Sequence, residues 1–272
     1  MKMWQVAWNS DRVRRYWNKK ARTYKDFSGS PSTLFYRERE LETLGEFFSK
    51  LEGKKFFTLD LWDEVHNTRV LSWAFQQGAV PYGIDIADYQ VSLVREKFKR
   101  WGIPVRNFKQ SDMRDIKFPA DSFDVLFSLG TIEHVPDYDR AARETYRVLK
   151  PGGMAIIGVP NKLDPFLRPL LVWFLDLLGK YPYSPEKSFT RKELVNLFEK
   201  EGFEVVDNIG FVFQPGLLRM ADIFFYLHFK PMCLVMNALM WPFFTLERRF
   251  KWVGRHGYII ACVLRKPKRR VK

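Results

Sequence analysis

Cysteine is scarce in this 272-residue chain: only Cys233 and Cys262 are present, far apart and without the spacing of a metal site. Their scarcity argues against a disulfide scaffold or a zinc centre and fits a reducing compartment. The N-terminal stretch MKMWQVAWNSDRVRRYW also lacks the apolar core of a signal peptide. We therefore expect a cytoplasmic protein that is not exported.

Acidic residues are few relative to basic ones, since 31 Asp and Glu stand against 45 Lys and Arg, a formal net charge of +14. This imbalance favours an anionic partner, either a membrane surface or a nucleic acid. Aromatic residues make up 17% of the chain, and aromatics beside Lys and Arg are typical of a membrane interface. The composition favours a peripheral position on the inner face of a membrane and argues against nucleic acid. The plainer alternative is a basic surface that meets only solvent.

Short apolar runs alternate with amphipathic segments, and 46% of the residues are apolar, which is enough for a sizeable core. Strands are expected at residues 56–61, 80–86, 105–109, 123–128, 154–159, 203–210 and 258–264. Helices are expected at residues 11–27, 33–51, 67–77, 89–101, 140–149 and 188–202, the last opened by a capping box of Thr190 and Glu193. This alternation predicts an α/β fold with a Rossmann-like, doubly wound sheet, mostly parallel with an antiparallel edge strand.

Three parts follow from the pattern. Residues 1–52 form an N-terminal helical segment, and residues 53–161 form the core, which would bind a ligand beyond the carboxyl ends of its strands. Residues 162–272 complete the sheet and carry an apolar helical insertion at about 164–178 and 211–250.

The stretch FPADSFDVLFSLGTIEHVPD, followed by RETYRVLKPGGMAIIGVPN, resembles the second half of a class I S-adenosylmethionine-dependent methyltransferase of the type 11 kind. The resemblance covers about residues 56–161 well and the flanks weakly. It implies S-adenosyl-L-methionine as the cofactor and methyl transfer as the reaction.

The resemblance also implies which residues hold the cofactor. Asp85 ends the second strand, where in this fold an acid accepts hydrogen bonds from both ribose hydroxyls, and Ile86 follows it. The matching positions for the adenine are Asp112, for the amino group, and Met113, which would pack on the ring. Backbone at Leu129 and Gly130 would lie beside the cofactor, and a glycine permits close approach.

The loop after the first strand departs from the family. Members carry a glycine-rich loop there, whereas this chain reads LDLWDEVHNTRVL without a glycine. Three interpretations stay open: Asp60 or Glu64 meets the ammonium of the cofactor in a differently built loop, the site has lost the cofactor, or the fold holds another ligand. The acids Asp85 and Asp112 favour the first.

Glu133 and His134 lie in the loop after the fourth strand. A histidine with an ordinary pKa near 6.5 can act as a general base at neutral pH, so these two residues are the catalytic candidates. The alternative is that they only shape the loop. Some ubiquinone-pathway members carry a metal-binding acid three residues before the matching Glu, where this chain has Gly130, so no metal site is predicted.

The segment 11–27 is amphipathic, and in the family a similar helix often covers the cofactor with a Tyr near its end. Tyr16 and Tyr24 are the candidates for that position. The alternative is a helix that merely packs on the fold.

Residues 223–246 contain no acid and a single Lys, and a spanning helix needs about 20 mostly apolar residues. Lys230-Pro231 and Pro242 interrupt this run, so we expect a helix lying in the membrane interface, joined by residues 166–178. The bases that would flank it are Arg248, Arg249, Lys251 and Arg255. The alternative is that both segments cover the sheet and bury one another.

Three functions compete at this point. The favoured one is a methyltransferase for a hydrophobic or lipid-linked small molecule at a membrane surface. The alternative is a catalytically inactive protein of the same fold that acts as a membrane-associated or partner-binding module. A methyltransferase for RNA or protein is disfavoured, because no nucleobase-methylating motif follows the fourth strand, which ends in Ser-Leu-Gly-Thr.

Overall fold

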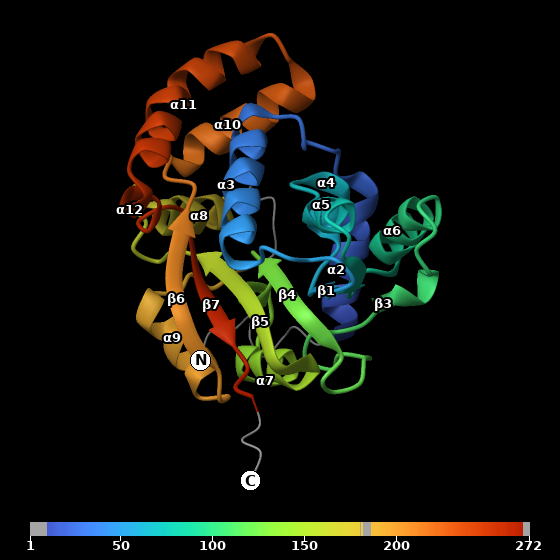
Figure 1. Ribbon diagram of the computed structural model, residues 1–272. Helices are drawn as coiled ribbons and strands as arrows, with labels where there is room; N and C mark the ends of the chain where they lie inside the picture. The colour runs from blue at the N-terminus through green and yellow to red at the C-terminus, as the bar shows by residue number, and fades with distance from the viewer. Residues whose placement is uncertain (1–9, 180, 182–185, 269–272) are drawn as a thin grey trace.

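The computed structural model describes residues 10–179, 181 and 186–268. In these residues seven strands form one sheet in the order β3-β2-β1-β4-β5-β7-β6 (Figure 1). The strands are β1 Lys55–Thr58, β2 Val80–Asp85, β3 Phe108–Gln110, β4 Phe123–Leu129, β5 Leu149–Pro160, β6 Glu204–Phe211 and β7 Ile259–Arg265. All pairings among β1 to β5 are parallel, and β7 runs antiparallel to both of its neighbours. The predicted fold class is confirmed, with the antiparallel strand next to the edge strand β6.

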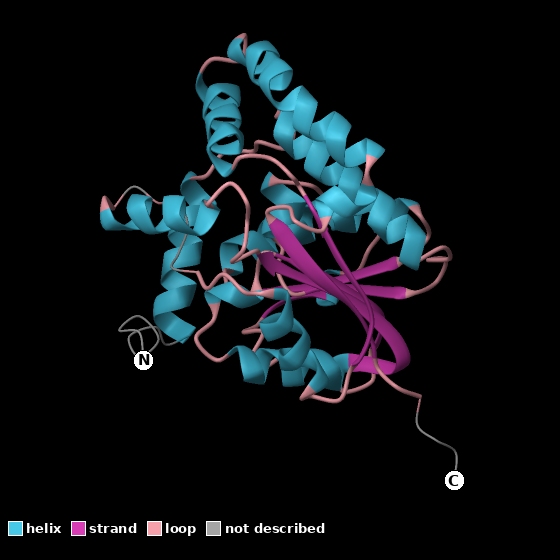
Figure 2. Cartoon of the chain, turned by 90° about the vertical axis from the view of Figure 1, so that its left-hand side faces the viewer, coloured by secondary structure: helices cyan, strands magenta, loops and turns pink. Residues whose placement is uncertain are grey.

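Helices cover both faces of the sheet (Figures 1 and 2). They are α2 Ser10–Thr23, α3 Pro31–Phe47, α4 Trp62–His66, α5 Val70–Gln76, α6 Asp88–Lys99, α7 Tyr138–Val148, α8 Arg168–Leu177, α9 Arg191–Glu199, α10 Gly216–His228, α11 Met232–Arg249 and α12 Lys251–Gly254. Successive strand residues point to opposite faces. Phe57 therefore joins the core under α7 and α9, whereas Phe56 joins the core under α3, α5 and α6.

The boundaries of most elements agree with the sequence to within a few residues. The capping box before α9 is present: Thr190 accepts from the backbone N–H of Glu193, whose side chain accepts from the N–H of Thr190. The strand expected at 105–109 was placed too early, because Pro104 starts a 3₁₀ turn, Val105–Asn107, and β3 begins only at Phe108.

Two other local predictions were wrong. The segment after β1 is not a loop, since Trp62–His66 forms the helix α4, with Asp63 and Glu64 favourably placed in its first turn. Pro242 does not break the second apolar helix, which runs through it from Met232 to Arg249. A proline is compatible with a helix when neighbouring groups compensate for its missing N–H.

The insertion between β6 and β7 contains α10, α11 and the short α12, and α10 and α11 pack as a pair beside α3 (Figure 1). Met236, Met240 and Phe244 recur at every fourth residue of α11, and this stripe packs against Phe35 of α3. This contact covers one face of α11, while the opposite face of the helix stays exposed.

Candidate active site

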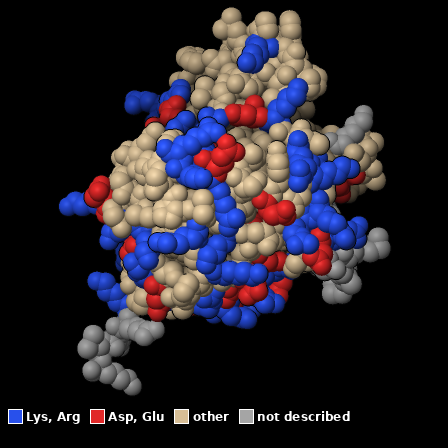
Figure 3. Space-filling model, turned by 90° about the vertical axis from the view of Figure 1, so that its right-hand side faces the viewer, with Lys and Arg blue, Asp and Glu red and all other residues tan. Residues whose placement is uncertain are grey.

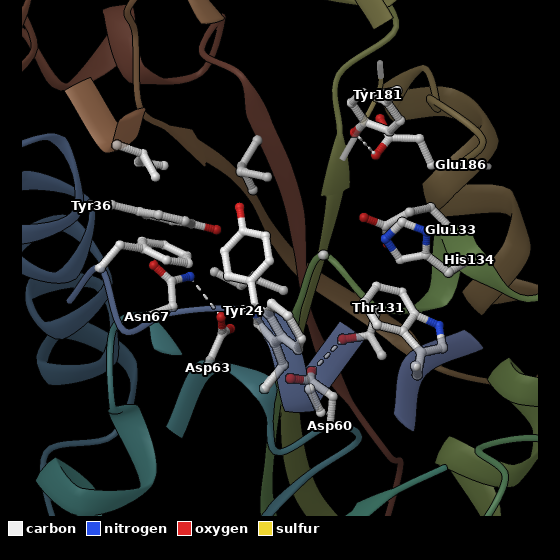
Figure 4. Close-up of a pocket in the computed structure, with 18 of the residues that line it drawn as sticks. Tyr24, Tyr36, Asp60, Asp63, Asn67, Thr131, Glu133, His134, Tyr181 and Glu186 are labelled. Atoms are coloured by element: carbon white, nitrogen blue, oxygen red, sulfur yellow. Dashed lines mark hydrogen bonds between the residues drawn. The ribbon is translucent and has the colours of Figure 1, made fainter. Parts of the chain in front are cut away.

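A cavity of about 540 Å³ lies at the carboxyl ends of β1, β2 and β4. The sheet order reverses between β1 and β4, which is the point where open α/β sheets bind ligands. Helices α2, α3, α8 and α10 contribute side chains to its walls. Figure 4 shows Tyr36, Asn67 and Asp63 on one side of this space and Thr131, Glu133 and His134 on the other.

Asp60 lies just after β1 and Asp85 ends β2, and both line the cavity. Asp60 accepts a hydrogen bond from the Thr131 hydroxyl, 2.5 Å away, and burial raises the pKa of its carboxyl. Asp85 accepts from the backbone N–H of Leu61 at 3.0 Å and of Ala87 at 2.8 Å. Burial raises the pKa of Asp85 to about 7 in spite of these bonds.

Helix α4 replaces the glycine-rich loop and brings its own side chains to the cavity. Trp62 and Asp63 line the space, and Asn67 donates to the Asp63 carboxylate at 2.6 Å. Burial, followed by the negative charge of Asp60, raises the pKa of Asp63 to about 8. Sequence reasoning missed Asp63 because an acid in a presumed loop carries no sign of its direction.

Glu64 does not line the cavity. Its carboxylate is buried against α5 and α6, where it accepts from the backbone N–H of Ser72 at 3.0 Å and also bonds the Ser72 hydroxyl and the Lys97 ammonium. These contacts give Glu64 a structural part in fixing α4 to its neighbours.

Asp112, the predicted adenine contact, also lines the cavity, but its carboxylate already has hydrogen-bond partners within the chain. Arg114 donates to both of its oxygens, at 3.0 and 2.7 Å, and Ser10 of α2 donates at 2.7 Å. The Arg114 and Ser10 bonds outweigh burial and hold the pKa of Asp112 below its usual range. Ile86 and Met113 line the same part of the cavity, as expected.

Leu129, Gly130, Glu133 and His134 all face the cavity from the end of β4 and the 3₁₀ turn that follows it. Gly130 has φ +76°, and a Cβ there would lie 3.6 Å from Oε1 of Glu133. Glu133 is 1% exposed, and its Oε2 has no hydrogen-bond partner in the described part of the chain. Burial, reinforced by the charge of Glu186, raises its pKa well above the ordinary value.

Helix α2 closes the cavity from outside. Its Trp17 ring contacts Trp62 at 5.6 Å and His134 at 5.4 Å between ring centroids. Tyr24, which follows the helix, lies 5.1 Å from Trp62 and lines the cavity, whereas Tyr16 is absent from its lining. Of the two candidate tyrosines, the structure therefore places Tyr24 at the site.

The far wall of the cavity was not predicted. Arg168 of α8 forms a buried ion pair with Glu186, and Tyr181 donates to the same carboxylate at 2.7 Å (Figure 4). Although burial opposes it, the Arg168 charge keeps the pKa of Glu186 below its usual value. Tyr258 and Gln214 complete this wall. No sequence motif links these residues, because they come from four separate segments.

Across the described residues, no cluster of three or more His, Cys, Asp or Glu side chains is arranged to hold a metal ion. The sheet order, the acids at its switch point and the covering helix are features of Rossmann-like proteins, which bind nucleotide-type ligands at this place in the fold.

Comparison with known proteins narrows this class. The family model described as a methyltransferase domain matches residues 65–157. A 2-methyl-6-phytyl-1,4-hydroquinone methyltransferase of Oryza sativa is 28% identical over 72% of this chain and 51% of its own length. A ubiquinone biosynthesis O-methyltransferase of Ruegeria pomeroyi is 27% identical over 68% of this chain and 76% of its own length. The chain spans about half the length of several of the curated relatives it matches, such as 57% of a ubiquinone biosynthesis O-methyltransferase of Cereibacter sphaeroides, which is 29% identical over 51% of this chain.

Solved structures agree on the fold. An S-adenosylmethionine-dependent methyltransferase from Mesorhizobium loti has a TM-score of 0.56 at 17% identity, covering 83% of this chain and 97% of its own. Geranyl diphosphate methyltransferase in complex with its cofactor has the same TM-score at 11% identity, covering 84% of both chains. Residues 65–157 therefore match a methyltransferase domain, and the chain has the fold of class I S-adenosylmethionine-dependent methyltransferases. S-adenosyl-L-methionine is the cofactor that goes with this domain and fold.

The acids of the cavity fit a positively charged cofactor. Asp60, Asp63 and Asp85 all border the space, and none of them forms an ion pair with a described residue. Three carboxyls whose pKa values burial has raised are stabilised in their charged form by a cation placed between them. The Trp62 and Tyr24 rings beside them can also stabilise a cation through their faces. The site therefore fits a ligand that carries an ammonium and a sulfonium group.

Proposed function

We propose that this chain transfers a methyl group from S-adenosylmethionine to a hydrophobic small molecule with a hydroxylated, quinol-type ring. One observation carries the proposal: a single cavity joins the acids at the ends of β1 and β2 to an apolar chamber walled by α8 and α10. The acceptor class is suggested by the relatives, whose names specify a phytyl hydroquinone and ubiquinone biosynthesis.

The residues divide between two tasks. Asp60, Asp63 and Asp85 would hold the cofactor, and Leu129 with Gly130 would lie against it. When bound, the cofactor supplies an electrophilic methyl group on a positively charged sulfur. The remaining task is removal of a proton from the ring hydroxyl, which needs a base facing the same space.

Glu133 is the base that the geometry favours. Its unpartnered oxygen lies at the cavity wall in a nearly water-free position, so a hydroxyl proton has an acceptor there. The two buried glutamates have opposite tendencies, since Arg168 keeps Glu186 charged while Glu186 itself disfavours charge on Glu133. Such a pair separates the group that accepts a proton from the group that stays ionised. His134 would orient the acceptor ring from the neighbouring position.

Calorimetry with S-adenosylmethionine, followed by transfer of a labelled methyl group to an alkylated hydroquinone or catechol, tests this function. We expect binding in the micromolar range and label in the acceptor. An absence of binding in the folded protein would instead support the inactive-module alternative. That alternative is supported by the hydrogen bonds that Arg114 and Ser10 donate to Asp112, because they use the carboxylate that was predicted to bind the adenine.

We also propose that the protein attaches to an anionic membrane surface, so that a lipid-borne acceptor can enter the chamber. Most of the exposed large apolar side chains of the described residues belong to α8, to the α10–α11 pair or to the segments beside them; examples are Leu167, Trp173, Leu177, Leu234, Trp241 and Trp252. Figure 3 shows the upper end of the molecule, where α10 and α11 lie, with few charged groups. Phe224 is both 56% exposed and part of the cavity wall, which links this surface to the site.

The attachment would be mainly apolar and peripheral. Within the described chain no helix has the length and apolar character required for crossing a bilayer. Two of the four expected basic residues are engaged by α3, since Arg248 pairs with Glu38 and Lys251 with Glu46. We therefore expect the electrostatic contribution to be smaller than the sequence indicates.

Flotation with vesicles of phosphatidylcholine and phosphatidylglycerol tests the attachment. The wild-type protein should float at low salt and lose only part of its binding at high salt, because screening acts on the exposed charges alone. Trp173→Glu should prevent flotation, whereas Val206→Glu, an exposed apolar position on β6, should not. A protein that stays unbound at low salt contradicts the proposal and favours a soluble acceptor.

A further inference from the structure

The cavity contains a buried amide that no residue in the described part of the chain satisfies. Gln214 is 1% exposed and lines the cavity between β6 and α10, yet neither its Oε1 nor its Nε2 has a hydrogen-bond partner among the described residues. A buried polar group without a hydrogen-bond partner destabilises the folded state. A ligand that supplies both a donor and an acceptor would remove this penalty.

The other polar side chains of this wall do not hydrogen-bond the Gln214 amide, because they form hydrogen bonds and ion pairs with one another. Arg168 donates to Glu186 and to the Tyr181 hydroxyl, and its guanidinium lies 4.5 Å from the centre of the Tyr258 ring. Tyr181 in turn donates to Glu186 at 2.7 Å. This network leaves Gln214 as the amide on that wall whose hydrogen-bonding capacity is unused.

The backbone around Gln214 is fixed. Its N–H donates to the carbonyl of Val212 at 3.0 Å, and the same carbonyl accepts from the N–H of Tyr258, also at 3.0 Å. A Cβ on Gly216 would lie 3.6 Å from Cγ of Arg168, so the segment also rests on that side chain. A side chain held in this way can select a ligand by position as well as by chemistry.

The wall beyond Gln214 is apolar. Met220, Ile223 and Leu227 recur on one side of α10 and line the same cavity, and Leu171 and Val172 of α8 line it as well. A molecule with its polar end at Gln214 would therefore lay an apolar tail along α10 toward the exposed Phe224.

We propose that Gln214 recognises the acceptor, by pairing its amide with two oxygens on neighbouring carbons of the acceptor ring. The amide Oε1 accepts from the hydroxyl and Nε2 donates to the adjacent oxygen. The two polar atoms of one amide are about as far apart as such neighbouring oxygens, whereas oxygens on opposite sides of a ring are too distant to meet both. The inference rests on the proposed function and adds the arrangement of the acceptor oxygens.

The test compares dodecylcatechol with dodecylhydroquinone, which differ only in the placement of two hydroxyls. Calorimetry on protein saturated with S-adenosylhomocysteine measures each affinity without turnover. We expect the wild type to bind the catechol about tenfold or more tightly than the hydroquinone. Gln214→Met, which keeps the length of the side chain, should reduce that preference to about onefold, with no loss of melting temperature or of cofactor affinity. Gln76→Met, at an exposed site on α5, is the matched control.

The outcomes separate this inference from the proposed function. Equal binding of the two probes by the wild type, or an unchanged preference in Gln214→Met, overturns the role of Gln214 while cofactor binding stands. If Gln214→Met fails to fold, Gln214→Leu serves instead, because it removes both polar atoms with a smaller apolar side chain, and retention of the preference again overturns the inference. Failure of the wild type to bind S-adenosylmethionine overturns the proposed function itself.

Discussion

The buried carboxyls on two walls of the same cavity have pKa values changed in opposite directions. At the ends of β1 and β2, Asp60, Asp63 and Asp85 have no ion-pair partner in the described chain, and burial raises their pKa values. On the far wall, Glu186 is as deeply buried but has Arg168 beside it, and its pKa is lowered despite the burial. The difference indicates that the first wall is completed by an external cation, whereas the second wall carries its own.

The largest effect should come from removing the base that lies between the two walls. Glu133→Gln keeps the shape of the side chain but cannot accept the proton, so we expect turnover to fall about 10²–10⁴-fold with cofactor affinity retained. Because the pKa of Glu133 is raised, wild-type turnover should increase as the pH rises above neutral, and the variant should lack that increase. If His134→Ala instead shows the greater loss, the base is His134.

Protonation of the acids on the first wall should change the free energy of unfolding with pH. Asp63 and Asp85 have folded pKa values of about 8 and about 7, above the ordinary 3.8. Their protonation stabilises the folded state at low pH, and this stabilisation is lost as the pH rises from about 4 through 7–8. The free energy of unfolding without ligand should fall by several kcal/mol across that window, up to about 10 kcal/mol.

Asp63→Asn should flatten this dependence, since the amide still accepts from Asn67 but does not titrate. Urea denaturation at a series of pH values measures the slope. A wild-type slope of zero would show that the acids of the first wall are already compensated by groups of the chain.

Loss of the Asp85 carboxylate should lower the affinity for S-adenosylmethionine, whereas loss of a surface acid should not. Asp85→Ala removes an acceptor for the ribose hydroxyls, so we expect S-adenosylmethionine to bind about 10- to 100-fold less tightly, the scale of hydrogen bonds to a charged group. Asp139→Ala, which breaks a surface pair with Lys200, is the control and should leave the affinity unchanged. Equal affinities for the two variants would remove Asp85 from the site.

The smallest effect on cofactor affinity is expected from Trp62, which lies on α4, the helix that stands in place of the glycine-rich loop. If Trp62 stabilises the sulfonium through its face, Trp62→Leu should weaken S-adenosylmethionine by about 2- to 30-fold. S-adenosylhomocysteine, which lacks that charge, should bind the variant and the wild type alike. Calorimetry with both ligands decides, because a parallel loss for the two would mean that Trp62 acts only by packing.

Much of the cavity wall at the carboxyl edge of the sheet could be predicted from the sequence. Asp60, Asp85, Gly130 and Glu133 lie at or within four residues of the end of a short apolar strand, and parallel strands bring their carboxyl ends to one edge. Glu64 shows the limit, because its position one residue after Asp63 in α4 turns it away from the cavity and onto Ser72. Adjacent positions on a helix point about 100° apart, so an error about whether a segment is helical changes which acid faces the ligand.

The doubly wound fold and most of the acids at the carboxyl edge follow from the sequence, because local apolar runs and short motifs encode them. Packing of the folded chain was needed to bring Arg168, Glu186, Gln214 and Tyr258 to one wall, to leave the Gln214 amide without a partner among the described residues and to bury one face of α11 against α3. These features depend on contacts between segments far apart in the chain. Neither residue spacing nor hydropathy records such contacts, since they arise only when the helices pack and exclude water from the space between them.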